Sequence, residues 1–129
     1  MIGVDTNIIV RLLTRDDESQ FRKAEKIFAG EQVFIADTVI LETEWVLRYA
    51  YQFKSDEIGQ AFTKLLGLVN VHVNNSEKLH RVLELHGRGL DFADAMHLAA
   101  GFSCGTFFTF DKAFVHRAEG LTDCLVRTP

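Results

Sequence analysis

The chain has 129 residues, of which 47% are hydrophobic and 25% are charged. This length fits one domain with a single core, and the composition is that of a globular protein rather than a disordered one. No apolar run is long enough to span a bilayer and the N-terminus lacks a signal peptide, so we expect one cytoplasmic domain over residues 1–129. The formal charge of -4 argues against a polyanionic partner, unless several acids are gathered to hold divalent cations.

The predicted elements alternate between short strands and helices. The helix after the second strand can be capped by Asp37 and Thr38, and it is apolar on most of its circumference, so we expect it to be largely buried. The alternation predicts a parallel sheet covered by helices on both faces. In chain order the elements are a strand at 1–5, helices at 7–14 and 17–29, a strand at 33–36, helices at 39–51 and 55–68, a strand at 69–73, helices at 74–86 and 90–102, a strand at 106–110, a helical turn at 111–114 and a strand at 124–126.

Two cysteines, Cys104 and Cys124, lie far apart in the sequence. Their surroundings contain no CxxC motif and no Cys/His spacing of a zinc site. We expect both to be reduced packing residues rather than a disulfide.

Four acids stand at the junctions between these elements. Asp5 ends the first strand and Asp111 follows the fourth strand, while Asp94 lies in the first turn of one helix and Glu42 lies one turn into another. In an open parallel sheet such positions face the carboxyl edge, where crevices form at the switch in strand order. The pattern predicts that four distant segments converge on one site.

Each acid also has a local explanation. Asp94 and Asp111 could be favourable charges at helix N-termini. Glu42 could belong to a solvated stripe of its helix. Asp5 could form an Asx-type turn with the two residues that follow it, although an unpaired carboxylate at the end of a buried strand is costly. The joint pattern, rather than any single acid, indicates a site.

Clustered carboxylates repel one another, so the cluster makes physical sense chiefly when a cation neutralises it. Because no His or Cys occupies matching positions, Mg²⁺ or Mn²⁺ is favoured over zinc. Such an ion makes a bound water a usable nucleophile, and two ions can stabilise both oxygens of a phosphodiester displacement. The site is therefore predicted to be hydrolytic and directed at phosphate.

Four segments carry a family resemblance: VDTNIIVRLL, TVILETEWVL, LDFADAMHLAA and FFTFDKAF. They resemble, in order and spacing, the PIN-domain nucleases, and more narrowly the VapC toxins of bacterial toxin–antitoxin pairs. The resemblance implies a three-layer α/β/α fold with a central parallel five-stranded sheet in the order 3-2-1-4-5. It also implies a Mg²⁺- or Mn²⁺-dependent endoribonuclease that uses a metal-activated water, forms a homodimer and is bound by a cognate antitoxin.

The resemblance also implies roles for individual residues. The catalytic and metal-binding acids would be Asp5, Glu42, Asp94 and Asp111, and the substrate-positioning neighbours would be Thr6, Asn7 and Thr109.

Glu42 is preferred to Glu44 as the acid of the third helix, because it occupies the family's acid position. Two residues along a helix turn a side chain by about 200°, so we expect Glu44 to face elsewhere.

Three further residues lie beside these acids. We expect Asp91 to be the N-cap of the helix that carries Asp94. We expect His97 to pack against the core or to make a supporting hydrogen bond rather than to bind metal. Lys112 is equally compatible with a solvated charge and with a phosphate contact.

The first two helices are locally basic. These side chains could steer an RNA backbone toward Asp5, although a solvated helix face explains them as well. The residues are Arg11, Arg15, Arg22, Lys23 and Lys26.

Two enzyme classes of similar fold are disfavoured. A haloacid-dehalogenase-type phosphatase would need Asp-x-Asp after the first strand, where this chain has Asp5-Thr6-Asn7. A dinucleotide-binding domain would need GxGxxG at that turn. The remaining alternative is a PIN-like module that binds metal or protein without cutting RNA, and such a module has no need of four clustered acids.

Overall fold

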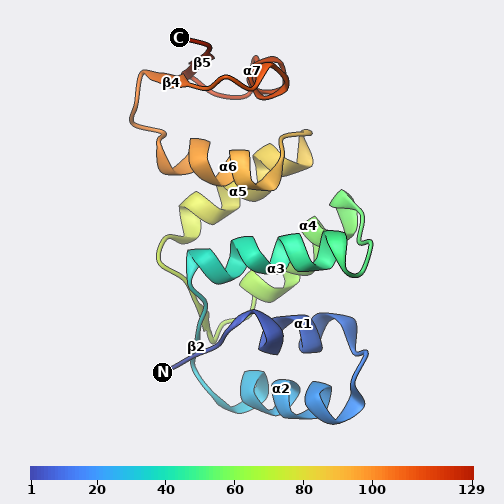
Figure 1. The fold of residues 1–129 in the computed structure, drawn as a ribbon. Coiled ribbons are helices and arrows are strands. Elements are labelled where there is room, and N and C mark those ends of the chain that lie inside the picture. Colours follow the sequence, from blue (N-terminus) through green and yellow to red (C-terminus); the bar gives the residue numbers. More distant parts are fainter. The chain divides into compact units, whose positions relative to one another are not determined.

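In the computed structural model, which describes residues 1–129, seven helices and five strands follow one another along the chain (Figure 1). They form two compact units, residues Met1–Ser76 and Glu77–Pro129, called here the N-terminal unit and the C-terminal unit. All five strands pair in parallel, and helices connect them, so the α/β class expected from the sequence is confirmed.

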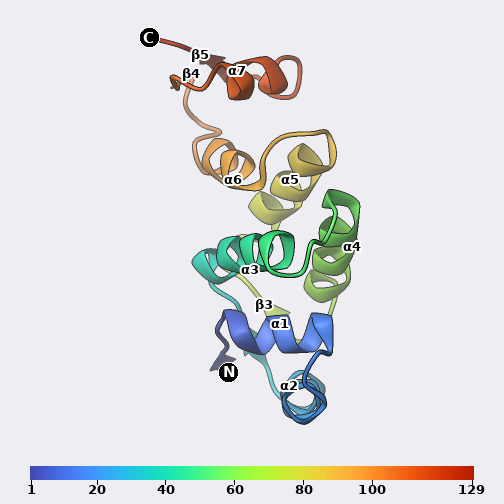
Figure 2. The ribbon, with the colours of Figure 1, turned by 45° about the vertical axis from the view of Figure 1, so that its right-hand side comes forward.

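The N-terminal unit contains a three-stranded sheet in the order β1-β2-β3. Ile2 of β1 lies opposite Val33 of β2, which lies opposite Val71 of β3. Helix α1 packs between α2 and α3, as both views show (Figure 2). The elements are β1 (Ile2–Gly3), α1 (Thr6–Thr14), α2 (Glu18–Gly30), β2 (Val33–Phe34), α3 (Asp37–Tyr49), α4 (Ser55–Leu66) and β3 (Val71–His72).

Apolar side chains from every helix of this unit form its core. They recur at the three- and four-residue spacing of a one-sided helix, and this spacing is why the segments fold as amphipathic helices. The fully or nearly fully buried ones include Ile9, Val10, Ala24, Ile40, Leu47, Ile58, Phe62 and Leu65, with Val33 of β2 and Ile35 just after that strand.

The C-terminal unit pairs two strands, β4 and β5, with Thr106 opposite Leu125. Phe107 of β4 contacts Phe114 of α7, with the ring centroids 5.6 Å apart, and this contact fixes the helix to the strand pair. The elements are α5 (Ser76–Gly87), α6 (Phe92–Ala100), β4 (Thr106–Phe108), α7 (Lys112–Ala118) and β5 (Leu125–Arg127).

The two sheets contain three neighbour pairs of the expected order 3-2-1-4-5, namely β3 with β2, β2 with β1 and β4 with β5. The remaining pair of that order, β1 with β4, stays a prediction. The same holds for the expected single domain over residues 1–129.

All twelve predicted elements exist, although every strand except the last is shorter than predicted, and three further differences concern the helices. Asp37 and Thr38 were expected to cap helix α3, but the helix already begins at Asp37. The N-cap residue is Ala36, and its side chain makes no capping hydrogen bond. Helix α7 continues to Ala118, well beyond the predicted turn. Helix α3 is less buried than expected, since more than half of the Trp45 and Tyr49 surfaces is exposed.

The cysteines are both free. Cys124 is buried, as expected, but Cys104 is exposed, so its predicted packing role is wrong. None of the helices combines the length and the apolar character that a membrane crossing would need.

Candidate functional site

Asp5 lies just beyond β1 and caps helix α1. Its backbone is extended, and its Oδ1 accepts a hydrogen bond from the backbone N–H of Ile8 at 3.3 Å. The side chain is exposed in this structure. The carboxylate is thus held at the helix N-terminus, where the helix dipole favours a negative charge.

Thr6 links this turn to helix α3. Its side chain is buried, with 5% of its surface exposed, and its hydroxyl donates a hydrogen bond to Oε1 of Glu42. Glu42 itself is exposed. One threonine, which follows the predicted acid Asp5 in the sequence, therefore contacts the predicted acid Glu42, although 36 residues separate Thr6 from Glu42. Asn7, the next residue of α1, is exposed.

The other two predicted acids lie in the C-terminal unit. Asp111 caps α7, and its Oδ1 accepts hydrogen bonds from the N–H groups of Ala113 at 2.9 Å and Phe114 at 3.2 Å. The hydroxyl of Thr109 accepts the N–H of Asp111 at 3.0 Å, so Thr109 orients the residue that carries the acid. Asp94 lies in the first turn of α6.

Asp91 is the N-cap of α6, as expected, and its carboxylate accepts the N–H of Asp94 at 3.3 Å. Burial raises the pKa of Asp94 above its ordinary value, and the nearby carboxylates of Asp91 and Asp111 raise it further. His97 and Arg117 act on the pKa of Asp94 in the opposite direction. Asp94 and Asp111 are therefore close enough to feel each other's charge, as a shared site requires.

The side chain of His97 is exposed beside Asp94, so the expected packing against the core is wrong.

Arg117 was not identified from the sequence. The signal for it was present, because Phe114 and Ala118 have the i, i+4 spacing that extends α7 past Arg117, and both are buried. Lys112 is exposed at the start of α7.

Glu44 faces away from Glu42, as expected. Only 1% of its surface is exposed, and its carboxylate accepts two hydrogen bonds from the Arg48 guanidinium, at 2.8 and 3.1 Å. Its charge is therefore satisfied within α3, and Glu44 belongs to the core rather than to a solvated stripe.

The basic character of α1 and α2 is largely neutralised. Arg11 contacts Asp16, and Arg15 and Arg22 both contact Glu18. Of the five basic residues considered for RNA steering, three are thus in ion pairs. The other two basic residues are Lys23 and Lys26.

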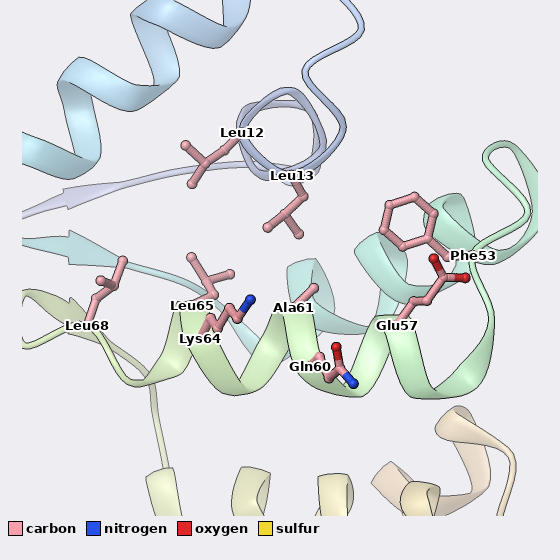
Figure 3. A pocket seen from close by; sticks show the side chains of 9 residues that line it. All are labelled: Leu12, Leu13, Phe53, Glu57, Gln60, Ala61, Lys64, Leu65 and Leu68. Carbon is pink, nitrogen blue, oxygen red and sulfur yellow. The ribbon is translucent and has the colours of Figure 1, made fainter.

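A cavity of about 450 Å³ lies between α1 and α4, within the N-terminal unit. Figure 3 shows Leu12 and Leu13 of α1 pointing toward Leu65 of α4, with Glu57 and Lys64 on the same helix. None of the predicted site residues lines this cavity. Its apolar wall suits an apolar side chain and offers no cluster of oxygen ligands.

The donor atoms at the predicted positions fit a hard divalent cation. Each unit presents two carboxylates, accompanied by the hydroxyl of Thr6 in one and of Thr109 in the other. Oxygen ligands of this kind suit Mg²⁺ or Mn²⁺. Within either unit, no group of three or more His, Cys, Asp or Glu side chains is arranged to hold an ion by itself.

Comparison with known proteins gives one family. The sequence model described as PIN domain matches residues 2–120, a range that includes all four acids. A search of curated proteins gave no match. PIN domains are generally nucleases and typically use divalent metal ions, so at this coarse level the comparison indicates a hydrolase acting on nucleic acid. Since the match covers most of its length, the chain belongs to the PIN domain family.

Proposed function

We propose that the protein is a Mg²⁺- or Mn²⁺-dependent endoribonuclease and the toxin of a type II toxin–antitoxin pair. The match to the PIN domain over residues 2–120 carries the proposal, because it spans Asp5, Glu42, Asp94 and Asp111. The local geometry supports it, since Thr6 connects the two acidic segments of the N-terminal unit and Asp94 feels the charge of Asp111.

Neither unit offers three ligands by itself, so the proposal requires the four acids to act in one site. Their oxygens would hold the cation, and Thr6 would keep the Glu42 carboxylate oriented. A bound divalent ion supplies Lewis-acid chemistry, making a water acidic enough to attack phosphorus and stabilising charge on the phosphate. Asn7 and Thr109 would position the substrate by hydrogen bonds.

A cleavage assay tests the enzyme assignment. Purified protein, freed of any antitoxin, is incubated with total cellular RNA in Mg²⁺ or Mn²⁺, and the products are resolved by size. We expect cleavage by the wild type and by Asp17→Asn, and none by Asp5→Asn. Asp17 is a matched control because it caps α2 as Asp5 caps α1, accepting the N–H of Gln20 at 3.0 Å.

Two results would contradict this proposal. Equal cleavage by the wild type and Asp5→Asn would point to a contaminating nuclease. No cleavage by any of them would favour the alternative, a PIN-like module that binds metal or protein.

The toxin role adds three expectations. The protein would form a homodimer, would act in the cytoplasm where RNA substrates are made, and would be inhibited by an antitoxin whose carboxyl-terminal segment packs over the site. Induced expression of the wild type should arrest bacterial growth, whereas Asp5→Asn should not. Normal growth with active, well-expressed wild type would exclude the toxin role without excluding the nuclease.

A further inference from the structure

The two cysteines, far apart in the sequence, lie just before two paired strands of the C-terminal unit. Cys124 comes directly before β5, and one residue, Gly105, separates Cys104 from β4. The strands lie side by side and parallel, with Thr106 opposite Leu125 (Figure 1). The N–H of Leu125 donates to the carbonyl oxygen of Gly105 at 3.0 Å, so the pairing reaches the residues next to both cysteines.

This register brings the two Cα atoms within reach of a disulfide bridge. Continued by one residue, it places Gly105 opposite Cys124, with Cys104 as the next residue along the chain. Strands lie about 4.8 Å apart and residues rise about 3.3 Å along a strand, so an offset of one residue gives a Cα separation of roughly 6 Å. Disulfides in proteins join Cα atoms about 4.4 to 6.8 Å apart.

The backbone before β4 leaves the Cys104 side chain free of the strand's alternation. In a continuous strand, Cys104 and Cys124 would point to opposite faces of the sheet. The chain instead bends at Gly105, and the N–H of Cys104 closes a turn onto the carbonyl oxygen of Gly101 at 2.9 Å. Cys104 therefore stands outside the pleat, and its side chain is not held on the opposite face.

The two thiols also interact electrostatically. Burial raises the pKa of the Cys124 thiol above its ordinary value, and Cys104 raises this pKa further. Such an interaction weakens with distance, so the two sulfur atoms lie close to each other in the fold. Only 6% of the Cys124 surface is exposed, whereas Cys104 is exposed. One thiol is open to molecules in solution, and the other is largely screened from them.

We propose that Cys104 and Cys124 form a reversible disulfide bridge between the segment before β4 and the start of β5 on exposure to a small-molecule disulfide. The Cys104 thiolate attacks one sulfur of that molecule. This step forms a mixed disulfide and releases a first small thiol, which takes up the proton that Cys104 lost. The Cys124 thiol then gives up its proton and attacks the Cys104 sulfur, and a second small thiol leaves. Two protein thiols are oxidised to one disulfide, and one small disulfide is reduced to two thiols.

The bridge would enclose β4, Asp111 and α7 in one covalent loop. A disulfide stabilises a protein mainly by restricting the unfolded chain. Because both cysteines are free in the structure, the fold does not require the bridge, and its effect would be an added, reversible stabilisation of this segment. The buried position of Cys124 favours a bridge within one chain over a bridge between two copies. The proposal does not depend on the nuclease function.

Thiol trapping and mass spectrometry test the bridge. The purified protein is equilibrated with reduced and oxidised glutathione at a series of ratios, then denatured and alkylated. We expect an unalkylated monomer lighter than the reduced protein by two hydrogen atoms, a peptide pair joined through Cys104 and Cys124, and recovery of both thiols with dithiothreitol. Glutathione that stays on Cys104 while Cys124 is alkylated would overturn the proposal, as would a disulfide-linked dimer.

Two single substitutions separate the steps. Cys124→Ala removes the second thiol without burying a new polar group, and it should accumulate the mixed disulfide on Cys104. Cys104→Ser leaves only the buried thiol, which should react with oxidised glutathione at least about tenfold more slowly. Equal rates in the two variants would overturn the proposed order of attack.

Thermal melting measures whether the native fold accepts the bridge. We expect the oxidised protein to melt higher than the reduced protein by roughly 5 to 10 °C. The variant that combines Cys104→Ser with Cys124→Ala is the control, and it should melt at one temperature in both glutathione buffers. A lower melting temperature of the bridged protein would mean that the bond forms only by distorting the strand pair, and the proposal would be wrong.

Discussion

Three aspartates of the candidate site region, Asp5, Asp91 and Asp111, each accept backbone N–H groups at the start of a helix. Capping explains a polar side chain at these positions, but it does not explain a charge, because asparagine caps helices as well as aspartate does. A metal ligand does need the charge. Replacement of Asp5 by asparagine therefore separates the two roles.

We predict that Asp5→Asn, in chelator, melts at the wild-type temperature or higher, because it keeps the cap and removes one charge of the proposed cluster of acids. Asp5→Ala should lose about 1 kcal/mol of stability through the missing cap. Thermal melts with and without Mg²⁺ should also show a smaller stabilisation by the ion in both variants. Asp17→Asn should respond to Mg²⁺ like the wild type, whereas a large loss of stability in metal-free Asp5→Asn would make Asp5 a structural residue.

The second prediction concerns Asp16. The Tyr51 hydroxyl donates to its carboxylate at 2.6 Å, and this hydrogen bond is the main reason that the pKa of Asp16 lies below its ordinary value. Because the pKa is lowered by folding, the associated stability is fully present above the unfolded pKa of about 3.9 and is lost as the pH falls through the folded pKa. In Tyr51→Phe, carboxyl NMR should show a higher Asp16 pKa. The stability difference from the wild type should be largest at neutral pH and shrink in acid, and an unchanged pKa would contradict the assignment.

For single residues, the sequence predicted the direction in which a side chain points better than it predicted which other segments cover that side chain. The turn of about 200° between Glu42 and Glu44 follows from helix geometry, so the outward Glu42 and inward Glu44 could be inferred. The exposure of His97 could not, because it depends on which distant segments cover α6.

Helix α3 carries the candidate acid Glu42 near its middle and the Glu44–Arg48 ion pair in its C-terminal half. Its existence followed from apolar periodicity, as did that of the other helices. The first residue of α3 could not be predicted in this way. Asp37 and Thr38 are both common cap residues, whereas Ala36, which takes the cap position, is a poor one. The extent of α7 was missed because a helix of two turns offers only one pair at helical spacing, Phe114 and Ala118, as its signal.

The ion pair within α3 gives an asymmetric prediction. Arg48→Met leaves the Glu44 carboxylate buried without its partner, and we expect a loss of roughly 3 kcal/mol of stability. Glu44→Gln removes the buried charge and leaves a partly exposed guanidinium, so it should cost clearly less. Chemical denaturation of both variants measures the difference. A larger loss for Glu44→Gln would mean that Arg48 is less accessible to water than the structure indicates.

On the scale of the whole molecule, the alternation of strands and helices predicted parallel pairing, and the pairs β3-β2, β2-β1 and β4-β5 agree with the expected order. Strand pairing is a long-range property: no residue in β1 specifies locally which distant strand lies beside it. The order therefore came from family resemblance, and periodicity alone would have left it open. The same limit applies to the proposed convergence of the four acids, which also came from family resemblance and remains a prediction.

The last prediction tests that convergence by a double-mutant cycle. If Glu42 and Asp94 hold the same ion, Glu42→Gln and Asp94→Asn should each weaken Mg²⁺ binding about tenfold or more, which removes about 1.4 kcal/mol of the stabilisation at saturating Mg²⁺. The double variant should lose less than the sum, because both acids would hold the same ion and the first substitution already weakens the coordination in which the second acid takes part. Melting temperatures over a Mg²⁺ titration measure each corner of the cycle.

In the control cycle, Asp17→Asn with Asp94→Asn, the effects should add. Additive losses for Glu42 and Asp94 would mean that the two acids act at separate sites, and the proposed four-acid centre would then be wrong.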